Sequence, residues 1–98
     1  MDVRKRNSSI DFTFKRGEVP DMNMHGKTCW VTAADISYHV GVVTVNGDAS
    51  PKYTATIRGR YQDGKTTEPE CVVYRSWDRC NIPGWFKKLI ESNKPSWF

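Results

Sequence analysis

The sequence lacks an apolar stretch near the roughly 18 residues that a membrane-spanning helix requires. It has only three cysteines, an odd number that is too small for a disulfide framework. Polar residues, and no apolar run, follow the basic segment at residues 4–6, which predicts a chain without a secretion signal. We therefore expect a cytoplasmic protein with reduced thiols and no membrane association.

Signatures of catalysis and of metal binding are also missing from the sequence. There is no glycine-rich phosphate loop and no Gly-x-Ser-x-Gly nucleophile elbow. His25 and Cys29 are four residues apart, but no Cys-x2-Cys pair accompanies them, so a zinc site is not indicated. Cys71 lies in the apolar run Cys-Val-Val-Tyr, where a thiol is usually an inert core residue. We predict a protein that is not an enzyme and holds no metal or cofactor.

What the sequence does contain is enough for one small domain. The chain has 98 residues, of which 38% are apolar and 12% aromatic, so it can bury a core of its own. We expect residues 1–98 to form a single α+β domain, with residues 1–8 as a flexible basic arm.

Alternating side chains predict most of the strands. Residues 10–15 alternate apolar and polar members, and so do residues 53–61. Residues 42–45 are rich in valine, and residues 71–74 supply an apolar returning strand. The sequence therefore predicts a small antiparallel sheet, composed of a three-stranded meander over about 42–75 and an N-terminal strand over 10–15.

Turn signals support this meander. Asn46-Gly47 and Asp63-Gly64 are the dipeptides that tight hairpin turns favour. Pro69 has no amide hydrogen to donate to a neighbouring strand. The strand that follows Pro69 is therefore expected at an edge of the sheet.

Two helices are expected, one of them short. Thr32 can cap a helix over about 33–40, with Asp35 in its first turn and Gly41 after its last residue. The second is an amphipathic C-terminal helix over about 83–92. Its apolar stripe is formed by Trp85, Phe86, Leu89 and Ile90.

Positive charge is concentrated in three segments of a chain whose net charge is +4. Residues 1–16 and 51–65 each carry +3, and residues 85–98 carry +2. In a strand over 53–61, two arginines share one face with two threonines, and such a face can hold phosphates by charge and by hydrogen bonding. A basic strand face that meets only solvent would have the same pattern. The candidate nucleic-acid-binding residues are Arg4, Lys5, Arg6, Lys52, Thr54, Thr56, Arg58, Arg60 and Lys65.

The segment Trp-Val-Thr-Ala-Ala-Asp-Ile-Ser-Tyr-His-Val-Gly-Val at residues 30–42 resembles the first helix of bacterial and phage winged helix-turn-helix domains. The resemblance extends over about residues 30–75, with a second helix from Ser50-Pro51 and wing strands over 66–75. It implies a winged helix as the alternative fold. The residues that would then approach the major groove are Lys52, Thr54, Thr56 and Arg58, with Lys65 on the wing beside the phosphates. The segment 41–49 is longer than the turn of that motif, which favours the meander.

These observations support two functional hypotheses. The first is a non-enzymatic nucleic-acid-binding protein, a small bacterial or phage regulator of transcription that contacts DNA rather than RNA. The second is a protein-interaction module, an inhibitor or adaptor that binds its partner through the C-terminal helix and exposed tryptophans, with Trp77 and Trp97 as candidates. A small domain also uses tryptophan simply to bury area. The sequence leaves the oligomeric state open.

Overall fold

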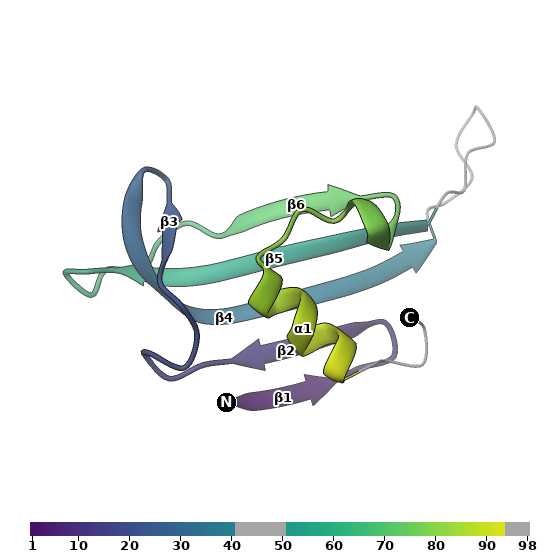
Figure 1. The fold of residues 1–98 in the computed structure, drawn as a ribbon, viewed down its shortest axis with the longest axis horizontal. Helices are drawn as coiled ribbons and strands as arrows, with labels where there is room; N and C mark the ends of the chain where they lie inside the picture. Colours follow the sequence, from purple (N-terminus) through teal and green to yellow (C-terminus); the bar gives the residue numbers. More distant parts are fainter. Residues whose placement is uncertain (41–50, 94–98) are drawn as a thin grey trace.

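The structure is a computed structural model that describes residues 1–40 and 51–93. Its main feature is an antiparallel sheet of six strands in the order β1-β2-β4-β5-β6, with the short β3 paired to β4 (Figure 1). A 3-10 helix, η1, and one α-helix, α1, follow the last strand. The elements are β1 (Asp2–Lys5), β2 (Ser9–Thr13), β3 (Met22–Met24), β4 (Lys27–Val40), β5 (Pro51–Tyr61), β6 (Glu70–Tyr74), η1 (Trp77–Arg79) and α1 (Gly84–Ser92).

The two longest strands, β4 and β5, form the centre of the sheet. They pair from Cys29 opposite Tyr61 to Val40 opposite Pro51. The register shifts once, between Val31 and Ala33, so that Thr32 is an extra residue in β4. Such a bulge changes the direction of the strand locally and increases its twist.

The hydrophobic core lies between one face of the sheet and α1, which crosses that face (Figure 1). The ring of Phe86 on α1 meets the ring of Phe12 on β2 edge to face, with centroids 6.1 Å apart. Trp85 meets Phe14 in the same way at 5.7 Å. The buried core residues are Ile10, Phe12, Phe14, Met24, Cys29, Val31, Ala34, Ile36, Ala55, Ile57, Phe86 and Ile90.

Several predictions from the pattern are confirmed. The protein is α+β, and the N-terminal strand, the strand over 53–61 and the C-terminal helix all form. The strand after Pro69 is β6, which lies at one edge of the sheet as expected. The sheet is larger than predicted, because β1, β3 and β4 add to it. The predicted strand at 42–45 and the Asn46-Gly47 turn lie outside the described residues.

The helix predicted over residues 33–40 is wrong, because this segment belongs to β4. Ala34 and Ile36 face the core while Asp35 between them faces away, which is the period of a strand. β4 also has a neighbour on each side, since it pairs with both β2 and β5. A two-turn helix over residues 33–40 would form fewer backbone hydrogen bonds than this strand forms with its two neighbours.

The same finding bears on the winged helix-turn-helix resemblance. The two helices that it implies, over about 33–40 and from residue 51, lie in β4 and β5. Thr32, expected as a helix cap, instead donates a hydrogen bond from Oγ1 to the carbonyl oxygen of Arg58, at 3.3 Å.

The N-terminal arm also needs correction, because most of it forms β1. Residues 2–5 pair with β2, from Asp2 opposite Thr13 to Lys5 opposite Ile10. The amino group of Met1 lies 2.8 Å from a carboxylate oxygen of Glu18, which fixes the start of the strand. Residues that pair along a whole strand do not act as a flexible arm.

Candidate nucleic-acid interface

The face of the sheet turned away from α1 carries the candidate site, and we call it the open face. Successive residues of a strand point to opposite sides. On β5, Ala55 and Ile57 are buried toward α1, so the residues alternating with them belong to the open face. Five predicted residues share it: Lys52, Thr54, Thr56, Arg58 and Arg60.

The neighbouring strand β4 leaves space beside Arg58. Arg58 lies opposite Ala33, and Thr54 lies opposite Ser37. Because these β4 side chains are small, the Arg58 side chain stays exposed. Thr56 is different, since it is only 8% exposed and can offer little to a ligand.

None of the three β5 cations has an ion pair in the described part of the chain. Neither Arg58 nor Lys52 lies within salt-bridge distance of a carboxylate there. Arg60 donates a hydrogen bond from Nη1 to the carbonyl oxygen of Gly64, at 2.8 Å, and so supports the turn after β5. This bond to a neutral carbonyl leaves the charge of Arg60 uncompensated.

Carboxylates occupy the centre of the open face. Asp35 on β4 lies opposite Asp11 on β2. Burial raises the pKa of Asp35 above its usual value, the negative charge of Asp11 raises it further, and the positive charge of Arg58 lowers it. The open face is therefore basic along β5 and acidic between β4 and β2.

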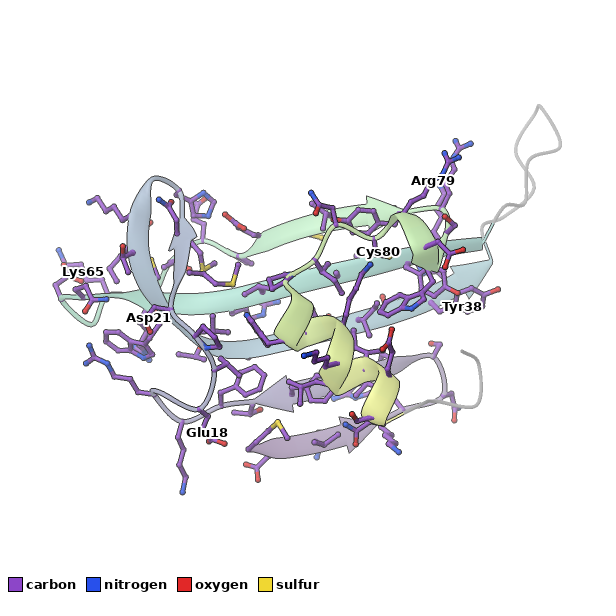
Figure 2. All side chains as sticks on the ribbon, in the orientation of Figure 1. Glu18, Asp21, Tyr38, Lys65, Arg79 and Cys80 are labelled. Atoms are coloured by element: carbon purple, nitrogen blue, oxygen red, sulfur yellow. The ribbon has the colours of Figure 1, made fainter. Side chains whose placement is uncertain are left out.

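The remaining predicted cations do not join the β5 group. Arg4 lies opposite Asp11 at the far edge of the sheet, and Arg6 makes an ion pair with Asp11, with its Nε 3.2 Å from the carboxylate. Lys5 is paired with the buried Ile10, which places it on the side of α1. Lys65 lies in the turn after β5, at one end of the molecule (Figure 2). The expectation of one continuous basic surface thus holds for β5 only. Arg4 shares the open face, but Asp11 and Asp35 lie between it and β5.

Sequence reasoning missed the group at the end of the open face next to Arg60. Trp30 on β4 lies directly opposite Arg60. The Cζ atom of Arg16, from the loop after β2, lies 3.9 Å from the centre of the Trp30 ring. Arg16 also donates a hydrogen bond from Nη2 to Oε1 of Gln62, at 3.1 Å. Regular alternation from the buried Ala34 and Ile36 would place Trp30 on the α1 side. The bulge at Thr32 turns it to the open face instead, so the sequence pattern gave no signal for its position.

The predicted tryptophan anchors are not supported by exposure. Trp77 is half-buried, with its ring centroid 6.0 Å from that of Tyr53, and Lys87 Nζ lies 5.6 Å from the centre of the same ring. Trp97 lies outside the described residues. Cys71, expected in the core, is exposed on β6 because it lies opposite Thr56 and so belongs to the open face.

Comparison with known proteins adds no assignment: no family model, no curated protein and no solved structure matches the chain. Within the described residues, no helix is both long enough and apolar enough to cross a membrane. The same part of the chain contains no group of three or more histidine, cysteine or acidic side chains suited to a metal ion.

Proposed function

We propose that the protein binds nucleic acid, without catalysis, along the β5 side of the open face. The observation that carries this proposal is the alignment of Lys52, Arg58 and Arg60 on one face of one strand. Cations in such a row attract a polyanion and position its backbone, because phosphate contacts need charge and not a particular base sequence.

The spacing of these cations supports contact with more than one phosphate. Arg58 and Arg60 are two residues apart, which in a strand is a separation of about 6.6 Å. Lys52 is six residues before Arg58, at a distance of about 20 Å along the strand. Because the three cations lie on the same face of one strand and that face is open, a single backbone can contact all of them.

Arginine is suited to this role at position 58. Its guanidinium presents several N–H groups in one plane, which match phosphate oxygens better than a single ammonium does. Thr54 is half-buried on the same face, four residues before Arg58, and supplies a hydroxyl between Lys52 and Arg58. The carboxylates of Asp11 and Asp35 repel phosphate, so the bound backbone follows β5 and not the centre of the sheet.

The test is a salt titration of binding to a fluorescent single-stranded oligonucleotide and to the corresponding duplex. We expect affinity to fall linearly with salt on logarithmic axes. The double variant Arg58→Gln and Lys52→Gln should weaken binding and reduce the slope by about one for each phosphate contact that is lost.

A matched control removes two cations from the other side of the sheet. Arg79→Gln with Lys88→Gln changes η1 and α1 and lowers the net charge equally, but both side chains lie away from the open face. This variant should retain the wild-type slope. No binding of either oligonucleotide at low salt, or equal loss in both double variants, would refute the proposal.

A further inference from the structure

A planar, positively charged platform lies at the end of the basic row, formed by Arg16 and Trp30. The Arg16 guanidinium carbon lies 3.9 Å from the centre of the Trp30 ring, well within the range of a cation–π contact. Gln62 accepts a hydrogen bond from the same guanidinium. The side chain is therefore held on the ring by two partners, although it is exposed.

An exposed guanidinium stacked on tryptophan can take a third flat group. The Trp30 ring lies against the guanidinium, and Arg16 is an exposed residue, so the guanidinium stays accessible to a ligand. Unpaired nucleobases stack on aromatic rings and on arginine planes in single-strand recognition. Gln62 and Trp30 already restrain the Arg16 side chain in the free protein. Less conformational entropy is therefore lost when a base stacks on it.

The position of the platform connects it to the basic row. Trp30 lies directly opposite Arg60 across the β4–β5 pair, and Arg58 is two residues further along β5. The Thr32 bulge lies between Trp30 and Ala33, so it separates the tryptophan from the small residues beside Arg58. A strand whose phosphates follow Arg58 and Arg60 therefore brings its next base to Arg16.

From this arrangement we infer that the ligand is single-stranded nucleic acid, with one unpaired base stacked on the Arg16–Trp30 platform. The inference rests on the proposed function, since the phosphates must first be held along β5. A duplex can make the phosphate contacts along β5. It cannot place a base on the Arg16–Trp30 platform, because its bases are already stacked on one another.

The experiment compares two oligomers of the same length and charge: oligothymidylate, and an abasic oligomer with sugars and phosphates only. We expect the wild-type protein to bind oligothymidylate about fivefold to tenfold more tightly than the abasic oligomer. Arg16→Lys keeps the charge but loses the plane, so this variant should bind the two oligomers nearly equally. Arg79→Lys on η1 is the matched control: it makes the same exchange outside the open face and should retain the preference.

The outcomes separate the inference from the proposed function. If neither oligomer binds at low salt, both fail. If the wild-type protein binds both oligomers equally and with a steep salt dependence, phosphate binding stands and the platform is refuted. Tighter binding of a duplex than of its single strand would also refute the platform. Trp30→Leu, checked for folding by circular dichroism, should abolish the preference as Arg16→Lys does.

Discussion

The two faces of the sheet are built from the same strands but have opposite character. Toward α1, β2, β4 and β5 present large apolar side chains such as Phe12, Ile36 and Ile57, which are 5% exposed or less. Away from α1 they present threonine, serine, aspartate and arginine, and no described element covers them. The comparison teaches that the two-residue period of the strands separates the apolar core from a polar surface, which is the surface that we propose for binding.

The largest expected effect tests the covered face. Phe86 is fully buried on α1 and meets the Phe12 ring across the core. Phe86→Ala removes most of a buried ring and leaves a cavity, so we expect a loss of about 3–5 kcal/mol in the free energy of unfolding. This is a large part of the stability of a small domain. Urea denaturation followed by circular dichroism measures it.

Arg58→Ala is the corresponding change on the open face. Arg58 has no ion pair in the described part of the chain, and its side chain is exposed. Its removal should change the free energy of unfolding by less than about 0.5 kcal/mol while weakening oligonucleotide binding. A loss of stability comparable to that of Phe86→Ala would show that the two faces are not independent.

An effect between those of Phe86→Ala and Arg58→Ala is expected at a close approach of the two central strands. Gly59 lies opposite Val31, next to the bulge, and a Cβ atom added there would lie 2.7 Å from the carbonyl oxygen of Trp30. Because that oxygen belongs to the backbone, it can move away only if β4 shifts. Gly59→Ala should therefore lower the free energy of unfolding by about 1–3 kcal/mol.

Gly84 provides the control for this substitution. It begins α1, its φ is not positive, and an added Cβ would meet nothing within 4 Å. Gly84→Ala reduces the freedom of the unfolded chain and should be neutral or stabilise by about 0.4–1 kcal/mol. Equal destabilisation by the two alanines would contradict the close approach of β4 and β5.

The parts of the fold that the sequence predicts are those whose local pattern agrees with the final packing. β5 alternates from Tyr53 to Tyr61, and α1 carries an apolar stripe, so both follow from period alone. β4 does not, because Ala33 and Ala34 are good helix formers and Asp35 suits a first turn. Pairing with β2 and β5 overrides that preference. Only pairing between residues far apart in the sequence makes residues 33–40 a strand. The local sequence pattern carries no information about that pairing.

The candidate site also has one part that the sequence predicts and one part that it does not. The β5 residues could be predicted because they need only one strand to share a face. The Arg16–Trp30 platform could not, since it joins a loop to a strand that was expected to be a helix. Arg4, Lys5 and Arg6 were grouped with β5 by charge alone. Pairing between β1 and β2 instead distributes them among an edge, the α1 side and an ion pair with Asp11.

The smallest predicted effects concern Asp35, where one substitution tests both stability and binding. Burial and the Asp11 charge raise the pKa of Asp35 in the folded protein. A carboxyl group with a raised folded pKa binds its proton more tightly in the folded state, so its ionisation destabilises the protein as pH rises through that pKa. Asp35→Asn should therefore be slightly more stable than wild type at pH 7. The advantage should vanish below the ordinary aspartate range, near pH 3, as denaturation at the two pH values would show.

The same Asp35→Asn variant should bind oligonucleotide more tightly, because the negative charge of Asp35 partly offsets the positive charge of Arg58. With the carboxylate removed, we expect oligothymidylate to bind about twofold to threefold more tightly at low salt, and the gain to disappear at high salt as charges are screened. Glu91→Gln on α1 makes the same change in net charge on the other side of the sheet. It should leave affinity unchanged. If it strengthens binding equally, net charge and not the open face attracts the ligand, and the functional separation of the two faces fails.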